Sequence, residues 1–188
     1  MRKPFLYIVV SLLTLVSPLW AEQWVLDSGH SKIVFTAEAR FFSSDGQFRK
    51  FDVKADIDEA ALEKSKVEVT VDVASIDTNN ERRDKHLRSK DFFDAETHST
   101  ATINIKGIRK ISATQFEADG DITIRGVTKS AVLPVRIVLF EGGILRFRGN
   151  VDLNRKDFGV SYNSRMNPVE DIVGIRYEVN LRKPKPKA

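Results

Sequence analysis

The sequence predicts an all-β protein in which antiparallel strands close into a barrel or a two-sheet sandwich. Apolar and polar residues alternate with period two along most of the 188-residue chain, as expected for strands with one buried face. The opposite faces are polar, and a sheet with one wet side is typically antiparallel. Turn residues separate about eight such segments, a number that closes readily and leaves few exposed edges.

Five segments alternate clearly and three alternate more weakly. The clear segments span residues 33–41, 51–57, 67–73, 101–105 and 173–181. The weaker segments span residues 116–125, 129–139 and 144–153, with glycines between them. Residues 43–46, which read Ser-Ser-Asp-Gly, predict a turn after the first strand.

Residues 79–89 break the alternation and predict a short helical insert. Thr78 or Asn79 suits the N-cap of this helix. Two adjacent aromatic residues, Phe92 and Phe93, follow the insert. A polar helix and paired aromatic rings between two strands are suited to cap one end of a barrel.

The first 21 residues predict a secretory signal peptide. A basic start precedes an apolar run over residues 5–16, and Ala21 is a small residue that suits cleavage. A membrane anchor fits less well, because the run is shorter than the roughly 20 residues that a span needs. The predicted domains are therefore the signal peptide, a barrel at 22–181 and a basic Pro/Lys tail at 182–188.

The distribution of charge argues against a nucleic-acid partner. The chain has 30 Lys and Arg residues against 26 Asp and Glu, a formal net charge of +4. Two of the basic residues lie in the predicted signal peptide and four in the tail, so the domain between them is slightly acidic. The tail predicts either a weak contact with an anionic membrane surface or a solvated end. The chain has no cysteine, which excludes disulfides, thiol catalysis and cysteine-ligated metals.

No set of residues predicts catalysis. His30, His86 and His98 share no helix or strand face at close spacing, so we expect structural roles and no metal site. Most carboxylates occupy outward strand positions, which gives little support to an acid pair for glycoside hydrolysis. Nucleophile-elbow, phosphate-loop and dinucleotide fingerprints are absent. We therefore expect a protein that is not an enzyme and that has no cofactor.

The interior of the predicted barrel is either filled or hollow. In the first strand, Ala37 and Ala39 lie between Phe35 and Phe41, so small residues would leave space that aromatic rings line. An eight-stranded barrel can be filled by side chains or can hold one small ligand, and the periodicity alone does not separate these alternatives. Four polar residues are candidates for a mouth that receives a head group: Arg83, Asp84, Arg125 and Arg155.

Several short motifs follow one another in a specific order along residues 23–181. They are Trp24-Val25-Leu26-Asp27, His30-Ser31, Val34-Phe35, Gly46-x-Phe48, Ser75-Ile76-Asp77-Thr78, Arg83-Asp84-x-His86-Leu87, Asp91-Phe92-Phe93-Asp94, Ile124-Arg125-Gly126-Val127-Thr128 and Arg155-x-Asp157-Phe158-Gly159. Together they resemble the YceI-like family, the lipocalin-like, polyisoprenoid-binding periplasmic proteins of bacteria. The resemblance implies a lipocalin-like eight-stranded antiparallel β-barrel with a long internal hydrophobic channel, and a binding or carrier role in the periplasm.

The resemblance also implies the ligand: a polyisoprenoid, an isoprenoid quinone or a similar long-chain amphiphile. The alternative is a dry-core barrel that acts as a structural or protein-interaction module in stress response or adhesion. The sequence leaves the oligomeric state open, with a homodimer among the options. Some residues face inward in the predicted strands, and others lie at the presumed opening. We expect these residues to line or gate the channel: Phe35, Ala37, Ala39, Phe41, Phe51, Val71, Phe92, Phe93, Ile103 and Ile105.

Overall fold

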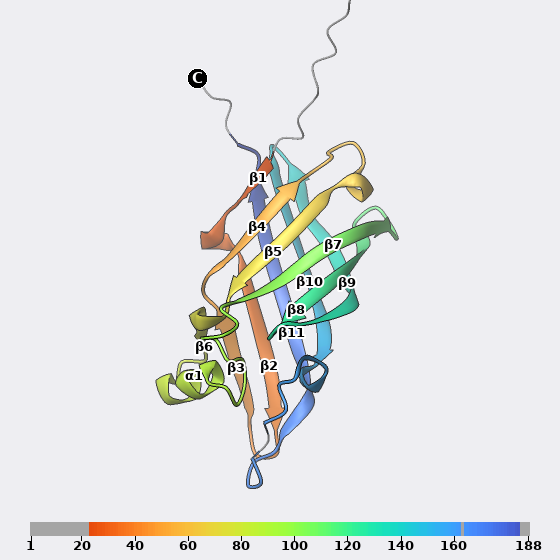
Figure 1. The fold of residues 1–188 in the computed structure, drawn as a ribbon. Coiled ribbons are helices and arrows are strands. Elements are labelled where there is room, and N and C mark those ends of the chain that lie inside the picture. Colours follow the sequence, from red (N-terminus) through yellow and green to blue (C-terminus); the bar gives the residue numbers. More distant parts are fainter. Residues whose placement is uncertain (1–22, 163, 185–188) are drawn as a thin grey trace, which may run out of the picture.

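The computed structural model describes residues 23–162 and 164–184, which form a closed antiparallel β-barrel (Figure 1). The predicted signal peptide and the last four residues of the predicted tail lie outside the described residues. Within the described part of the chain, no helix has the length and apolar character needed to cross a membrane.

Eleven strands and several short helices make up the structure. The strands are β1 (Gln23–Leu26), β2 (Lys32–Ala39), β3 (Ser43–Phe48), β4 (Phe51–Asp56), β5 (Lys66–Asp72), β6 (Ile76–Asp77), β7 (Thr100–Lys110), β8 (Gln115–Ile124), β9 (Val127–Glu141), β10 (Ile144–Asn154) and β11 (Val169–Arg182). The helices are α1 (Glu81–Arg88) and the 3-10 turns η1 (Ser28–His30), η2 (Leu62–Lys64), η3 (Val73–Ser75) and η4 (Arg155–Phe158).

The sheet closes into a ring. Its hydrogen-bonded order is β1-β4-β5-β7-β8-β9-β10-β11, and β1 also pairs with β11. Three strands of the ring continue beyond a break: β1 into β2, β4 back into β3, and β5 into β6. The continuations pair in the order β11-β2-β3-β6. Each interrupted pair counts as one long strand, so the predicted eight-stranded barrel with a short helical insert is confirmed.

The turn predicted at residues 43–46 is wrong, because these residues belong to β3. The chain reverses earlier, where the Ala39 N–H donates to the Phe42 carbonyl at 3.2 Å. Gly46 then pairs with Phe35 on β2. A Cβ on Gly46 would lie 2.3 Å from the Phe35 ring, so the glycine provides room for that ring and does not mark a turn.

The upper end of the barrel in Figure 1 is closed by a hydrophobic cluster. Trp24 of β1 is 2% exposed and pairs with Ala55 of β4. Leu181 of β11 is fully buried and pairs with Leu26. Burial of a Leu or Val side chain stabilises a fold by about 1.5–3 kcal/mol, so this cluster holds the ring closed where β1 meets β11.

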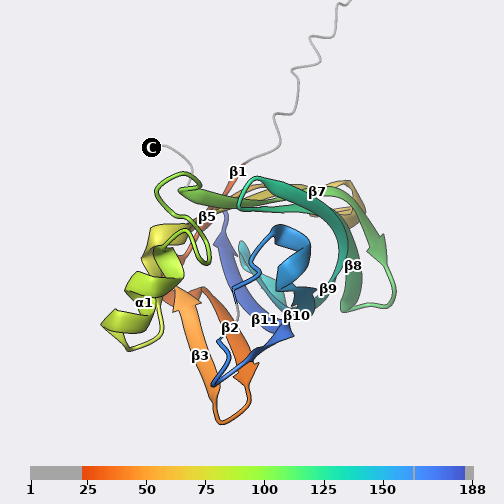
Figure 2. The same cartoon turned by 60° about the horizontal axis from the view of Figure 1, so that its bottom comes forward.

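The strand pairing is incomplete at the lower end. β6 pairs with β3 and not with β7, and the β9–β10 ladder ends at the pair of Arg136 and Arg148. The chain inserts α1 between β6 and β7, and places η4 after β10. Figure 2 shows η4 across the lower opening of the barrel, with α1 beside it.

Candidate binding cavity

The barrel encloses a cavity of about 280 Å³. Among the residues that line it, only Ser65, Thr102, Arg155 and the phenol of Tyr177 carry polar side-chain atoms. Small-molecule sites typically occupy about 300–1,000 Å³ and combine an apolar lining with a few polar groups. This cavity lies close to the lower end of that range and is more apolar than most.

The alternation of the strands creates this lining. Inward positions of neighbouring strands pair across the ladder, as Val69 does with Ile103 and Val71 with Ala101. Small residues on several strands line the space without filling it, and they include Ala37, Ala101 and Ala118. The hollow is thus a consequence of residue size at positions that face inward.

Seven residues of the predicted channel contribute to this lining. They are Phe35, Ala37, Val71, Phe92, Phe93, Ile103 and Ile105. Phe35, Phe48 and Phe93 form a row of rings that links β2, β3 and the segment after α1, with centroids 5.9 and 6.1 Å apart. The sequence thus identified the correct phase on β2, β5 and β7, and the aromatic pair after the helix.

Three predicted residues lie elsewhere. Phe41 is 71% exposed, because β2 ends at Ala39 and the inward phase ends with it. Ala39 is half-buried, pairs with Val169 and does not line the cavity. Phe51 has the inward phase of β4 but packs against the upper hydrophobic cluster around Trp24.

The prediction overlooked the lining contributed by the second half of the barrel. This set includes Phe116, Ala118, Ile122, Leu133, Leu145, Phe147 and Tyr177. The period-two signal was present in β8, where Phe116, Ala118 and Ile122 are buried and alternate with less buried residues. Gly120 stands at an inward position of β8 and interrupts the apolar face, which weakens the signal.

Two segments cover the lower end of the cavity. The α1 cover, residues 78–99, contributes Leu87, Phe92 and Phe93 to the lining. The η4 cover, residues 155–162, contributes Phe158 and Val160. The four residues predicted to form a polar mouth all lie at this end, and each of them forms hydrogen bonds with the protein.

Arg83 and Asp84 fix the start of the α1 cover. The buried carboxylate of Asp84 accepts hydrogen bonds from the backbone N–H of Thr78 at 2.9 Å and from its hydroxyl at 2.5 Å. Arg83 donates to the Thr78 hydroxyl and carbonyl, and to the hydroxyl of Ser44 on β3. The Asn80 side chain caps α1 by accepting from the Arg83 N–H. These bonds tie the insert to β3.

Arg125 joins the two covers. It lies in the β8–β9 turn with a positive φ of 53°, and its guanidinium donates to carbonyls on both sides. One bond reaches the Gly159 carbonyl at 2.7 Å and the other the Lys90 carbonyl at 2.9 Å. Because Lys90 belongs to the α1 cover and Gly159 to the η4 cover, a single side chain clamps both.

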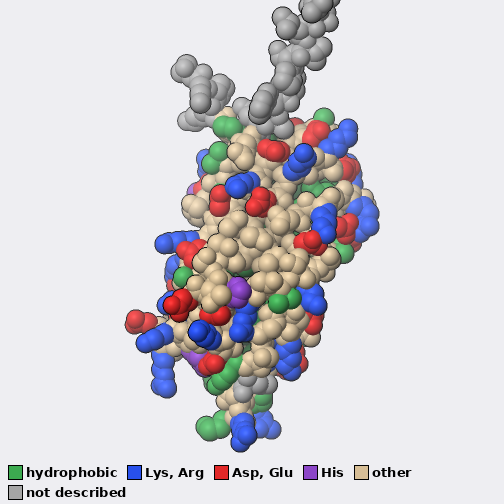
Figure 3. Space-filling view, viewed as in Figure 1, with side chains coloured by type: hydrophobic (Ala, Val, Ile, Leu, Met, Phe, Trp, Pro, Cys, Tyr) green, Lys and Arg blue, Asp and Glu red, His purple; other side chains and the backbone are tan. Residues whose placement is uncertain are grey.

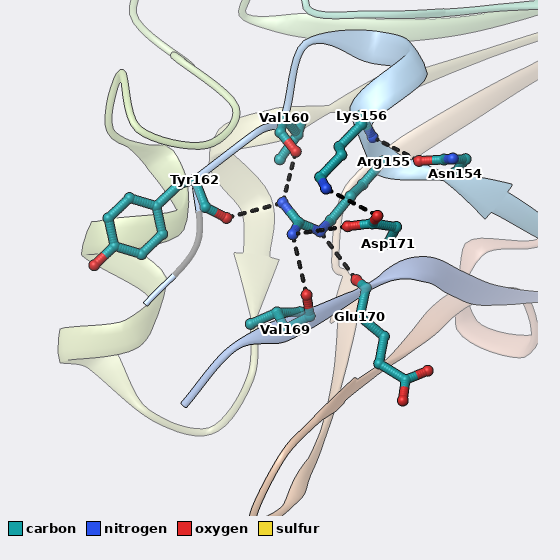
Figure 4. A network of polar contacts seen from close by, with 8 residues as sticks. All are labelled: Asn154, Arg155, Lys156, Val160, Tyr162, Val169, Glu170 and Asp171. Carbon is teal, nitrogen blue, oxygen red and sulfur yellow. Dashed lines mark hydrogen bonds and ion pairs between the residues drawn. The ribbon is translucent and has the colours of Figure 1, made fainter. Parts of the chain in front are cut away.

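Arg155 anchors the η4 cover to β11 (Figure 4). Its buried guanidinium donates to the carbonyls of Val160, Tyr162, Val169 and Glu170, and to the Asp171 carboxylate at 3.3 Å. A guanidinium has five N–H donors, and these contacts use all of them. The donors of Arg155, one of the candidates for a polar mouth, are therefore bonded to the protein.

A cluster of three rings also connects the covers. The imidazole of His86 lies edge-on to Phe92 and Tyr162, with centroids 5.0 and 4.9 Å away, and Phe92 lies 5.0 Å from Tyr162. Asp91 approaches the His86 Nε2 at 3.1 Å. His86 therefore packs between the covers in the manner expected of a structural histidine. Among the described residues, no group of three or more His, Asp or Glu is placed to hold a metal ion.

Tyr177 also brings a polar group, its phenol, to the cavity. Its hydroxyl donates to the Pro134 carbonyl, and burial raises its pKa well above the usual value for tyrosine. A Cβ on Gly149 would lie 1.9 Å from that carbonyl, so the glycine makes the contact possible. The cavity thus presents a guanidinium and a phenol that are both already bonded to the protein.

Comparisons with known proteins agree with this architecture. Residues 24–181 match the model of the YceI-like domain, which confirms the resemblance in the sequence. A UPF0312 protein of Azotobacter vinelandii is 38% identical over 120 residues, 61% of this chain and 62% of that protein, so the match spans less than two thirds of the relative. BcnA of Burkholderia cenocepacia has a TM-score of 0.77 at 25% identity, covering 82% of this chain and 98% of that one. A polyisoprenoid binding domain of Saccharophagus degradans has a TM-score of 0.69 at 12% identity, covering 87% and 99%, which is a likeness of fold alone.

Proposed function

Because this chain belongs to the YceI-like family and encloses an apolar cavity, we propose that it is a carrier for a long-chain amphiphile such as a polyisoprenoid or an isoprenoid quinone. The observation that carries this proposal is the lining of the cavity, which is apolar from the upper cluster to the covers. The Saccharophagus domain that shares the fold is itself described as polyisoprenoid-binding.

The chemistry of the lining favours a chain over a polar ligand. Each methylene that leaves water contributes about 0.8 kcal/mol, so several isoprene units supply substantial affinity without any polar contact. The buried guanidinium of Arg155 and the phenol of Tyr177 are bonded to the protein and offer little to a head group. We therefore expect chain length and branching to govern selectivity, with the head group near the covers.

A dry-core barrel fits these observations less well. Side chains in filled protein interiors leave few voids larger than a water molecule, and this barrel retains a cavity of about 280 Å³. The apolar lining also favours binding over catalysis, since Arg155 and Tyr177 are bonded to the protein. A protein-interaction role would instead require the outer surface.

We further propose that the carrier works in the periplasm. Support comes from the sequence of residues 1–21, which has the three-part layout of a signal peptide. Detection of a chain that begins at Glu22 in a periplasmic extract would agree with this proposal. A full-length chain in the cytosolic fraction would contradict it.

Organic extraction and mass spectrometry of the purified protein test the carrier function. The expected result is a co-purifying isoprenoid or other long-chain lipid, and uptake of an added prenyl lipid by protein that has been stripped of lipid. If the protein contains no lipid and takes up none, the proposal fails.

The chain provides a matched pair of variants for this experiment. Ala37 lines the cavity, whereas Ala39 lies two residues further along the same strand and does not. Ala37→Trp should fill the space and reduce uptake, while Ala39→Trp should retain it. Equal uptake by the two variants, with both folded, would place the ligand outside the cavity.

A further inference from the structure

We propose that the lower tip of the barrel docks on the surface of an anionic phospholipid membrane. The lower tip consists of the β2–β3 turn, residues 40–43, and the loop at residues 164–168. This inference rests on the proposed carrier function and adds the surface from which the carrier would load or unload its lipid. The tip is apolar and basic, joins two distant segments and lies at the lowest point of the barrel in Figure 1.

The tip has the most exposed hydrophobic side chains of the described part of the chain. Met166 is 81% exposed, Phe41 is 71% exposed and Phe42 is 57% exposed. Single exposed apolar residues are ordinary on a protein surface, but large ones gathered at one point mark an interaction site. Two of these three are aromatic, and a phenylalanine gains strongly from transfer out of water.

Hydrogen bonds join two segments of the tip that lie far apart in the sequence. The Arg40 N–H donates to the Pro168 carbonyl at 3.1 Å, and the Phe41 N–H donates to the Asn167 side chain at 3.1 Å. Behind them, Ala39 pairs with Val169 in the ladder of β2 and β11. These contacts hold the aromatic turn beside the loop that carries Met166, so the exposed apolar side chains belong to one joined tip.

The charge of the tip is positive. The two segments contain Arg40 and Arg165 and no carboxylate, and the Arg40 guanidinium lies 5.9 Å from the centre of the Phe41 ring. Within the described residues neither arginine forms an ion pair, and both are exposed. The neighbouring acids, Glu38 and Glu170, lie on the strands behind the tip. Arginine beside exposed apolar side chains suits the boundary between anionic head groups and acyl chains.

The position and shape of the tip favour a membrane over a protein partner. Figure 1 shows the two segments as the lowest point of the molecule, and Figure 3 shows hydrophobic and basic side chains there. A projecting point offers little of the roughly 800 Å² per partner that a stable protein interface buries, but it can enter the head-group layer. Val169, which follows the tip loop, lines the cavity, and the η4 cover precedes that loop. The tip would therefore place the covered end of the cavity against the membrane.

Sedimentation with vesicles of phosphatidylglycerol and phosphatidylcholine tests this inference. The parent should bind these vesicles, more weakly at high salt, and should bind vesicles of phosphatidylcholine alone less. The combined change Phe41→Ser, Phe42→Ser and Met166→Ser should reduce binding roughly tenfold or more, because the apolar anchor is lost. A matched variant, Ile111→Ser with Val132→Ser and Val138→Ser, removes three exposed apolar side chains elsewhere and should bind as the parent does.

Further variants in the same assay test whether the basic tail or a contact between copies of this chain accounts for any binding. A chain that ends at Pro184 should still bind vesicles. If this shortened chain loses binding while the tip variant retains it, the contact belongs to the basic tail and the inference is overturned. A parent that fails to bind vesicles, or a tip variant that binds as the parent does, also overturns it. If the parent is a dimer, the tip variant a monomer and neither binds vesicles, the tip is an interface between copies of this chain.

The carrier function is measured separately in the same preparations. The tip variant should retain the extracted lipid of the parent, because its changes lie outside the cavity. Lipid in the cavity together with unchanged vesicle binding would refute the membrane contact alone. An empty cavity that takes up no prenyl lipid would refute the carrier function, whatever the tip does.

Discussion

The two ends of the barrel are closed by different kinds of interaction. At the upper end, Trp24, Leu181 and their neighbours form a continuous hydrophobic cluster within the paired strands. At the lower end, where the strand pairing is incomplete, Arg125 and Arg155 hold two covers through backbone carbonyls. We infer from this contrast that the upper end supplies stability and that the ligand of the proposed carrier passes through the lower end.

Physical chemistry explains why the clamps at the lower end are easier to release. Hydrophobic burial is lost only when the surrounding structure opens to water, whereas a hydrogen bond can be exchanged for one to water at a net cost of about 0.5–1.5 kcal/mol. The covers also bury Phe158 and Val160, so we expect their polar clamps to exchange with water before these side chains leave the interior. We infer that a ligand enters and leaves between the α1 cover and the η4 cover.

The largest expected effect is at the upper end. Trp24→Ala should lower the free energy of unfolding by about 3–5 kcal/mol, because it leaves a cavity in the cluster that joins β1 to β11. Chemical denaturation measures this loss. Val25→Ala, at the adjacent exposed position, should change stability by about 0.5 kcal/mol or less. A similar loss in both variants would show that the Trp24 cluster does not close the barrel.

The next largest effect is expected at Arg155, which anchors the η4 cover. Arg155→Met leaves several buried carbonyls unpaired and should lower stability by about 2–4 kcal/mol. Hydrogen exchange should accelerate most at residues 159–162 and least in β1 and β4. Uniform acceleration throughout the barrel would contradict the division between the two ends.

Arg125 provides a test of access with a smaller effect on stability. Arg125→Ala should cost only about 1 kcal/mol, since its two bonds lie in an exposed turn and water can replace them. The release of a fluorescent prenyl lipid to acceptor vesicles should nevertheless be faster, because both covers lose their shared clamp. Arg109→Ala, which removes an ion pair with Glu117 on the outer surface, is the control and should release lipid at the parent rate.

The smallest effect concerns acid. Hydrogen bonds from His30 and then Arg182 hold the pKa of Asp27 below its ordinary value of 3.8. Because the pKa is lowered on folding, this carboxylate contributes stability above the ordinary value, and the contribution is lost as the pH falls through the folded pKa. Asp27→Asn should therefore flatten the acid limb of the stability profile below about pH 4, and chemical denaturation at several pH values measures this. If the parent and Asp27→Asn show the same pH profile, the ion pair of Asp27 with Arg182 does not contribute to the stability of the upper end.

The sequence predicted what depends on local periodicity. The inward phases of β2, β5 and β7 placed Phe35, Val71 and Ile103 at the cavity, because side chains alternate along any strand. It did not reveal that β2 ends at Ala39, since that end depends on a hydrogen bond from Ala39 to Phe42 and on pairing with β11. The prediction for Phe41 failed for this reason.

The sequence also placed Arg125 and Arg155 among the polar residues of one end, but it did not show which groups they bind. Arg155 looks like a free cation in the sequence, because its partners are backbone carbonyls that carry no signature in the side-chain pattern. The same holds for Arg125, whose acceptors lie 34 and 35 residues away in the chain. Only the folded structure brings these carbonyls to the guanidinium groups.

The most direct test of the carrier function is the position of a bound chain within the barrel. A photoreactive prenyl lipid, cross-linked to the protein and mapped by peptide mass spectrometry, reports that position. The expected cross-links fall on cavity-lining residues such as Phe93, Ile103 and Val173. Cross-links confined to outward residues of β9 such as Val132 and Val138, or none at all, would contradict binding in the cavity.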